Sequence, residues 1–228
     1  MPTPLELVAK PHPVPVQWNS VALLIIDMQR DFLEWGGFGD SLGNDIEQVR
    51  RCITPCINLL KAWRTAELPV IHTREGHLPD LSDVPSNKLQ LGNGLKIGDH
   101  GQMGRLLVIG EPGQDIIPEL YPLPTEKLID KPGKGAFYHT DLDDYLQANG
   151  INTLLVCGVT SEVCVHSTIR EATDRGYRCI ALEDCCASYF PALHEVAMQM
   201  VASQGGIFGA VTSSQAVYEL LQAKQIEV

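Results

Sequence analysis

Short runs of consecutive apolar residues recur along the chain and alternate with segments whose apolar residues have helical spacing. Runs of about four to eight apolar residues bounded by polar or turn residues are typical of strands buried on both faces. The first run is VALLII at residues 21–26, and another opens the stretch NTLLVCGVTSEVCVHSTIREATDR at residues 152–175. Strands and helices that alternate in this way form βαβ units around a mostly parallel sheet.

The pattern predicts an α/β fold, a three-layer αβα sandwich around a mostly parallel central sheet of about six strands. It indicates a single domain over residues 1–228, in which residues 1–18 form an irregular arm on the surface or on a neighbouring subunit. Asp45 is a candidate N-cap for the first long helix. The predicted strands are residues 21–26, 68–73, 127–130, 153–157, 178–182 and 207–211, and the predicted helices are residues 46–65, 140–148, 161–176, 191–203 and 214–223.

Residues 78–126 do not follow the alternation and are rich in Gly, Pro and Asp. Within them, GRLLVIG at residues 104–110 predicts a short strand, and residues 114–120 predict a helical turn or two. Irregular connections of this length are usually functional or cover a site.

Composition and charge narrow the classes of function. The formal net charge of −11 argues against nucleic acid or an anionic membrane as the main partner. No apolar run approaches the ~20 residues that span a bilayer, and the proline-rich start does not resemble a signal peptide. The seven cysteines, an odd number in mostly apolar settings, predict free thiols in a reducing cytoplasm rather than a disulfide framework. Cys52 and Cys56 lie on one predicted helix, but no further ligand is near them in the sequence to complete a metal site.

Three polar residues follow three predicted strands: Asp27, Lys131 and, a little further on, Cys164. Because the carboxyl ends of parallel strands meet at one edge of a sheet, these residues are expected to converge. Cys164 also falls near the start of a predicted helix, for which Ser161 is a candidate N-cap, and a helix start lowers a thiol pKa. The set suits attack by a thiolate, with Asp27 as proton acceptor, Lys131 as balancing cation and backbone N–H groups as an oxyanion hole. Packing for the cysteine and a simple ion pair for the other two explain the same pattern, so both interpretations stand at this point.

Three segments, IIDMQRDF, DKPGKGAF and GVTSEVCVHSTIREATDRGY, resemble the signatures of the isochorismatase-like cysteine hydrolases. The resemblance covers nearly the whole chain and implies a parallel sheet flanked by helices, commonly assembled into homotetramers. It implies that Asp27, Lys131 and Cys164 form a catalytic triad. It also implies a cis peptide between Val159 and Thr160, so that the N–H groups of Thr160 and Cys164 form the oxyanion hole.

The same resemblance bears on cofactors. Nicotinamidases of this family bind a metal through an Asp-x-His pair and a further His after the second strand. The corresponding segment here, HTREGHLPDLSD, contains no Asp-x-His, so neither a metal nor another cofactor is expected. His72 and His77 are expected to be hydrogen-bonded structural residues.

HTREGH, DKPGKGAF and MVASQGGIFG are most similar to the corresponding segments of biuret and triuret hydrolases. The expected function is a cysteine-dependent amidohydrolase that cleaves a C–N bond of a small linear ureide, biuret or triuret, through a thioester. Ureidoacrylate, N-carbamoylsarcosine or nicotinamide as substrate remain alternatives, as does a non-catalytic protein with a reactive thiol. Motif position makes Phe32 an expected wall of the substrate site, Lys134 a donor to a distal carbonyl and Gln204 a partner for a terminal amide. Glu75 and Arg74 are further candidates, for which a surface ion pair is the simpler explanation.

Overall fold

A computed structural model describes the chain at residues 5–88 and 94–226. Within these residues, the centre is a six-stranded sheet in which all neighbours pair in parallel. In order across the sheet, the strands are β10 (Ala210–Thr212), β9 (Arg178–Ala187), β8 (Thr153–Val159), β3 (Val21–Ile26), β4 (Val70–Glu75) and β7 (Lys127–Lys131). The predicted α/β class and the predicted strand number are confirmed.

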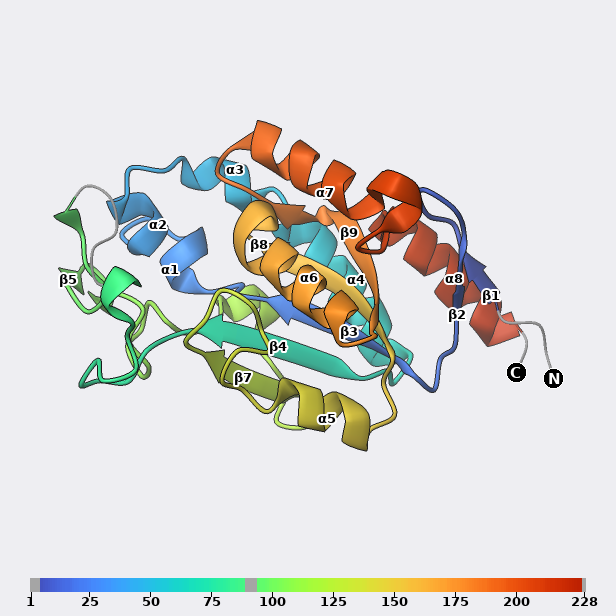
Figure 1. The fold of residues 1–228 in the computed structure, drawn as a ribbon, viewed down its shortest axis with the longest axis horizontal. Helices are drawn as coiled ribbons and strands as arrows, with labels where there is room; N and C mark the ends of the chain where they lie inside the picture. The colour runs from blue at the N-terminus through green and yellow to red at the C-terminus, as the bar shows by residue number, and fades with distance from the viewer. Residues whose placement is uncertain (1–4, 89–93, 227–228) are drawn as a thin grey trace.

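Helices cover both faces of the sheet, as the three-layer prediction requires. The main helices are α3 (Ile46–Arg50), α4 (Ile53–Thr65), α5 (Leu142–Ala148), α6 (His166–Asp174), α7 (Pro191–Gly206) and α8 (Ser214–Ile226). In Figure 1, α6 and α7 lie in front of the sheet, α4 and α8 lie behind it, and α5 lies beside β7 at the lower edge. Among the described helices, none is long and apolar enough to cross a membrane.

The strand order places a topological switch at the centre of the sheet. From β3 the chain moves outward to β4 and β7, then returns to β8 and moves outward the other way to β9 and β10. The connections therefore leave the carboxyl ends of β3 and β8 on opposite faces, which opens a crevice where ligands bind in such sheets. All residues of β3 and β8 are buried, which explains why both appear in the sequence as continuous apolar runs.

The helix predicted over residues 46–65 is broken into α3 and α4. Asp45 caps α3 as predicted, its Oδ1 accepting a hydrogen bond from the Glu47 N–H at 3.0 Å. The break follows from Pro55, which has no N–H to donate to the carbonyl oxygen of Arg51 and whose ring collides with that carbonyl in a helix.

Several strands extend beyond their predicted ends. The prediction of residues 68–73 becomes β4 at Val70–Glu75, and β8 and β9 continue through Val159 and Ala187. Apolar runs mark only the central part of each strand, because the partner strands supply hydrogen bonds to polar residues as well. As a consequence, Glu75 and Lys131 are paired in register at the ends of β4 and β7.

The expectation of an irregular arm at residues 1–18 is wrong for its described part. β1 (Leu5–Leu7) and β2 (Val14–Val16) pair antiparallel, and Lys10 exchanges two backbone hydrogen bonds of 2.8 Å with Val211 of β10. Leu7, Val14 and Val16 are buried, which accounts for the alternating apolar residues of this segment.

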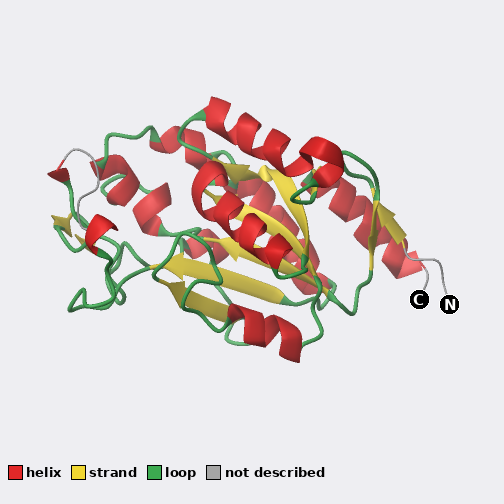
Figure 2. Cartoon of the chain, in the orientation of Figure 1, coloured by secondary structure: helices red, strands yellow, loops and turns green. Residues whose placement is uncertain are grey.

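Residues 76–88 and 94–115 of the long connection lie at the end of the sheet toward which β4 points in Figure 1, and Figure 2 shows them as mostly loops there. Residues 118–126 return beside α4 to the start of β7, where Arg64 bonds to Tyr121 and Glu126. The strand predicted over residues 104–110 is reduced to β6 (Gly104–Arg105), which pairs with β5 (His100–Gly101). The apolar residues that follow, such as Leu107, are buried without forming a strand. The predicted turn at residues 114–120 is the short helix η3 (Pro118–Leu120).

The helix α7 has apolar side chains on its solvent-facing side. Leu193, Val196 and Met200 are 45%, 48% and 39% exposed and lie about one helical turn apart. The homotetramer implied by the family resemblance stays a prediction.

Gly158 is a position at which the backbone of β8 lies close to that of β3. Its φ of +117° is unfavourable for other residues, and a Cβ atom there would lie 2.0 Å from the carbonyl oxygen of Ile26.

We expect Gly158→Ala to lower the free energy of unfolding by about 3–5 kcal/mol, since backbone strain and overpacking act together. The measurement is urea denaturation, with Gly150→Ala as control. Gly150 also has positive φ but has no neighbour within 4 Å of the added Cβ, so about 1 kcal/mol is expected. Equal losses in the two variants would contradict this explanation.

Candidate active site

Four side chains meet at the carboxyl edge of the sheet. Asp27 follows β3, Glu75 ends β4, Lys131 ends β7, and Cys164 lies in the turn after β8. The first three side chains are fully buried, and Cys164 is 4% exposed. The structure thus brings together the three residues expected to converge and adds Glu75 to them.

Lys131 forms the central ion pair of this group. Its Nζ lies 2.8 Å from Asp27 Oδ2 and donates to the carbonyl oxygens of Gly133 and Lys134 at 2.9 and 3.0 Å. The other oxygen of Asp27 accepts a hydrogen bond of 2.6 Å from the Thr73 hydroxyl. Burial by itself lowers the pKa of Lys131, but Asp27 and the other negative groups outweigh it and raise the pKa. Lys131 therefore remains a cation.

Cys164 lies within reach of both carboxylates. Its thiol donates to Glu75 Oε2 at a sulfur–oxygen distance of 3.6 Å. The sulfur, one oxygen of Asp27 and one oxygen of Glu75 all lie within 4.8 Å of one another. Burial raises the pKa of the thiol, Lys131 opposes this, and the two carboxylates add to it. The expectation that a helix start lowers this pKa is therefore wrong, and the thiol needs a nearby proton acceptor.

Glu75 is bound by several ammonium groups. Its Oε1 accepts hydrogen bonds from Lys134 Nζ at 2.7 Å and Lys88 Nζ at 3.0 Å, and its Oε2 lies 3.9 Å from Lys131 Nζ. Burial alone raises the pKa of Glu75, but these cations outweigh burial and lower the pKa to about 2. The side-chain amide of Gln29 holds the Glu75 backbone on both sides, with hydrogen bonds of 2.7 and 2.8 Å. Gln29 and Lys88 were not identified from the sequence.

The turn that carries Cys164 is a π-helix, η4 (Ser161–Val165), rather than the start of an α-helix. Ser161 does not act as the predicted N-cap, because its hydroxyl is hydrogen-bonded to His194 Nδ1 at 2.8 Å. The carbonyl oxygen of Thr160 instead accepts bonds from the backbone N–H groups of Val163 and Val165. The peptide bond between Val159 and Thr160 is cis, as the family resemblance implies.

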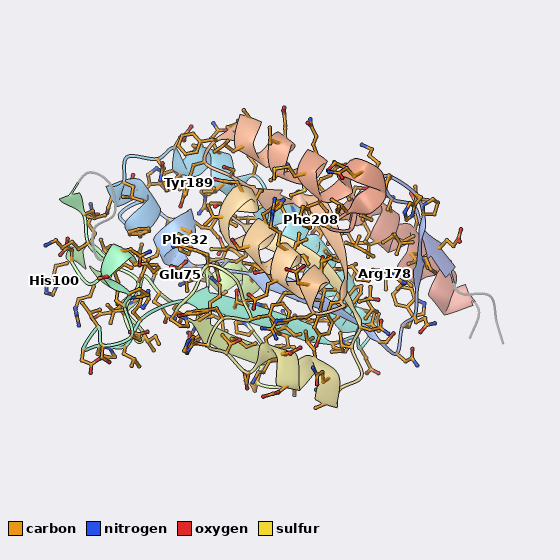
Figure 3. All side chains as sticks on the ribbon, in the orientation of Figure 1. Phe32, Glu75, His100, Arg178, Tyr189 and Phe208 are labelled. Carbon is orange, nitrogen blue, oxygen red and sulfur yellow. The ribbon has the colours of Figure 1, made fainter. Side chains whose placement is uncertain are left out.

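A cavity of about 390 Å³ lies above Cys164. Its polar end includes Glu75 and Lys134, and much of its wall is aromatic. Figure 3 shows Phe32, Glu75 and Tyr189 at this same end of the molecule, and the Tyr189 hydroxyl donates a 2.8 Å hydrogen bond to the Phe32 carbonyl oxygen. One side of the cavity is formed by the short helices α1 (Arg30–Leu33) and α2 (Phe38–Ser41) and by the segment after α2, which contribute Phe32, Phe38, Gly39, Leu42 and Asn44. The other lining residues are Glu75, Lys134, Val159, Thr160, Glu162, Val163, Cys164, Tyr189 and Phe190.

Two of the residues considered for substrate contact lie elsewhere. Gln204 is exposed near the end of α7 and does not line the cavity, since helical geometry ends before it and its φ is +51°. Arg74 points to the opposite face of β4 from Glu75 and pairs with Asp130 at 2.8 Å and Asp115 at 2.9 Å. Arg74 therefore forms ion pairs, the simpler of the two roles considered for it, and does not contact the cavity. Gln204 of this chain does not reach the site.

A metal ion does not fit among the acidic residues of this site. In the described residues, the side chains close enough together to bind one metal ion are those of Asp27, Glu75 and Cys164. The ammonium of Lys131 already lies among them, and it would repel a second cation in these buried surroundings. His72 is hydrogen-bonded to Glu126 at 3.1 Å, in agreement with its expected structural role.

The geometry can now be set beside known proteins. Residues 21–216 match the model of the isochorismatase domain. Ureidoacrylate amidohydrolase RutB of Methylorubrum extorquens is 31% identical over 228 residues, an alignment that covers 97% of this chain and 92% of that protein.

Solved structures give the same picture. A cysteine hydrolase from Pseudomonas syringae pv. phaseolicola superposes with a TM-score of 0.78 at 27% identity, covering 92% of this chain and 96% of the other. N-carbamoylsarcosine amidase from Thermoplasma acidophilum superposes with a TM-score of 0.65 at 25% identity, covering 86% and 96%.

The ion cluster predicts a pH dependence of stability. Because the pKa of Glu75 falls from 4.5 to about 2 on folding, its ionised form stabilises the fold above pH 4.5, and this contribution is lost as the pH falls toward 2. We expect Glu75→Gln to cost about 3–5 kcal/mol at pH 7, since it leaves buried cations without their partner. Calorimetric melting between pH 7 and pH 2 is the measurement. The difference in the free energy of unfolding between the variant and the wild type should become smaller as the pH falls from 4.5 toward 2. The control is Glu119→Gln at an exposed position, which should follow the wild type. A gap that stays constant with pH would contradict the prediction.

Proposed function

The chain belongs to the isochorismatase family, and on that premise we propose that it is a cysteine-dependent amidohydrolase that cleaves a carbamoyl C–N bond of a small ureide. The observation that carries the proposal is a buried cysteine with a lysine and two carboxylates around it, at one end of a partly aromatic cavity. A thiol, a proton acceptor and a fixed cation are the groups that attack on a carbonyl carbon requires.

The proposed reaction uses each of these groups once per half-reaction. Asp27 accepts the thiol proton, and the Cys164 sulfur attacks the carbamoyl carbon while Lys131 stabilises the negative charge nearby. The N–H groups of Thr160 and Cys164 bind the oxyanion of the tetrahedral intermediate. The C–N bond breaks as Asp27 returns the proton to the leaving nitrogen, which departs as ammonia or an amine. In the second half-reaction, water attacks the thioester while Asp27 takes a proton from it and passes that proton to the leaving sulfur, so the thiol is regenerated and the acyl group departs as an acid.

Among ureides, we place N-carbamoyl compounds of the ureidoacrylate type first. The support is the name of the relative that aligns over 97% of this chain, together with the N-carbamoylsarcosine amidase among the structural neighbours. Both substrates carry a carbamoyl group next to a second polar group. The cavity is larger than a carbamoyl group alone needs, and its aromatic walls exclude water from it.

A neutral ureide such as biuret or triuret is the second candidate, and the charge of the cavity favours it. Of the described residues that line the cavity, Lys134 is the one cation, and it is already bound to Glu75. Glu162 adds a further carboxylate to the wall. A substrate with its own carboxylate must therefore share Lys134 with Glu75, whereas a neutral ureide does not.

The mechanism predicts that Cys164→Ala lowers kcat by at least about a thousandfold, because the nucleophile is lost. Released ammonia is the measurement, with circular dichroism to verify the fold. The control is Cys179→Ala, at a buried cysteine outside the cavity, whose thiol contacts the Ile169 carbonyl. Full hydrolysis by Cys164→Ala would exclude the proposed function. If the wild type turns over no amide at all and Cys164 is instead oxidised by mild peroxide, the reactive-thiol alternative holds.

A substrate panel separates the candidates. We expect the highest kcat/KM for ureidoacrylate or another N-carbamoyl compound, with biuret and triuret next and nicotinamide last. Lys134→Met should raise KM for substrates with a carboxylate about tenfold more than for biuret, since it removes the cation that a carboxylate needs. Turnover of nicotinamide alone would contradict the ureide class, and equal effects of Lys134→Met on both substrate types would exclude Lys134 as the carboxylate partner.

A further inference from the structure

Lys88 is a partly buried cation next to the site that does not line the cavity. It ends the short helix η1 (Ser86–Lys88), and its side chain is 13% exposed. Its Nζ has three acceptors: Glu75 Oε1 at 3.0 Å, His77 Nε2 at 3.2 Å and the Pro132 carbonyl oxygen at 2.6 Å. An ammonium group has three donors, so all of them are used. Such a set of partners fixes the ammonium in one place.

The partners of His77 define its state. Because Lys88 can only donate, Nε2 of His77 must be the acceptor, and the proton of a neutral ring is then on Nδ1, which lies 3.1 Å from Asp83 Oδ2. Burial and then the Lys88 charge lower the pKa of His77, which favours the neutral ring. Glu75, Gly76 and His77 have the spacing of an acid-x-His pair, but the group that they enclose is an ammonium of the chain itself.

The charges around Glu75 are the second observation on which the inference is built. In the described part of the chain, three ammonium groups, those of Lys88, Lys131 and Lys134, contact the buried carboxylate of Glu75 within 4 Å. Asp27 and Glu75 supply two negative charges, so the cluster has one positive charge in excess while Cys164 is a thiol. Burial and the two carboxylates still raise the pKa of Cys164, so the cations that offset the charge of Glu75 bear directly on whether the thiolate forms.

We propose that Lys88 is a positioning residue of the active site, an internal cation that holds Glu75 in place and compensates its charge so that the Cys164 thiolate can form. Lys88 acts through Glu75, which lies between it and the sulfur. The inference builds on the proposed role of Cys164 as nucleophile but does not depend on which ureide is cleaved.

Other groups around the two residues also affect the charge of Cys164 and stay unchanged in the test. The charged and titratable groups that face Cys164 or Lys88 are Asp27 after β3, Glu75 in β4, His77 and Asp83 after β4, Lys131 in β7, Lys134 after β7, Glu162 in η4 and Tyr189 after β9. A change that moves only Lys88 therefore isolates its contribution.

The experiment is the pH profile of Cys164 alkylation by iodoacetamide, followed by peptide mass spectrometry, which needs no substrate. We expect Lys88→Met to move the midpoint about one pH unit upward and to slow alkylation at pH 7 about tenfold, because the charge of Glu75 is no longer compensated. Lys88→Arg keeps the charge and should restore most of the rate. Lys96→Met, at an exposed lysine, is the matched control and should behave as the wild type.

A folded Lys88→Met protein with the wild-type profile overturns the proposal. With the best ureide, the variant should lose kcat about tenfold at nearly constant KM, since Lys88 does not line the cavity. If Lys88→Met does not fold, ¹⁵N NMR of the histidines in the wild type decides instead. A neutral His77 with its proton on Nδ1 at pH 7 supports the Lys88 contact, and a charged His77 or the other tautomer excludes it. Absence of ureide turnover in a protein that shows the alkylation shift would count against the proposed function alone.

Discussion

The structure depends on a cluster of charges that is almost completely removed from water. Lys131, Asp27 and Glu75 are fully buried, and each buried ion costs several kcal/mol unless partners replace its hydration. The partners come from distant parts of the chain: a hydroxyl from β4, backbone carbonyls after β7 and two further lysines. The rest of the fold can be understood as the frame that holds these partners at hydrogen-bond distance.

The parallel sheet supplies that frame. The strands β8, β3, β4 and β7 are neighbours in this order, so the residues at their carboxyl ends lie close together at one edge of the sheet. Gly158 permits the close approach of β8 to β3, and the π-turn that follows directs Cys164 toward Glu75. Above them, Phe32 and Tyr189 form part of an aromatic wall, which keeps water away from the charges and strengthens their interactions.

The predictions that succeeded were those that depend on one local pattern or on the geometry common to all parallel sheets. The central strands were found because burial on both faces leaves a continuous apolar run. Asp27, Lys131 and Cys164 could be placed together because the carboxyl ends of parallel strands lie at one edge of the sheet. The broken helix at residues 46–65 was also predictable, since Pro55 is visible in the sequence. Gln204 was misplaced because motif position does not show where α7 ends or which way the chain turns there.

By itself, the sequence determined the α/β class, the approximate positions of the six central strands and the identity of the three side chains at the sheet edge, because these follow from periodicity and topology. Only the tertiary structure decided the charge state of the site. The pKa of Cys164, the ionisation of Glu75 and the contact of Lys88 with His77 depend on burial and on distances of a few ångströms between residues far apart in the chain. No local pattern encodes such distances, since electrostatic energies change steeply with separation and with exposure to water.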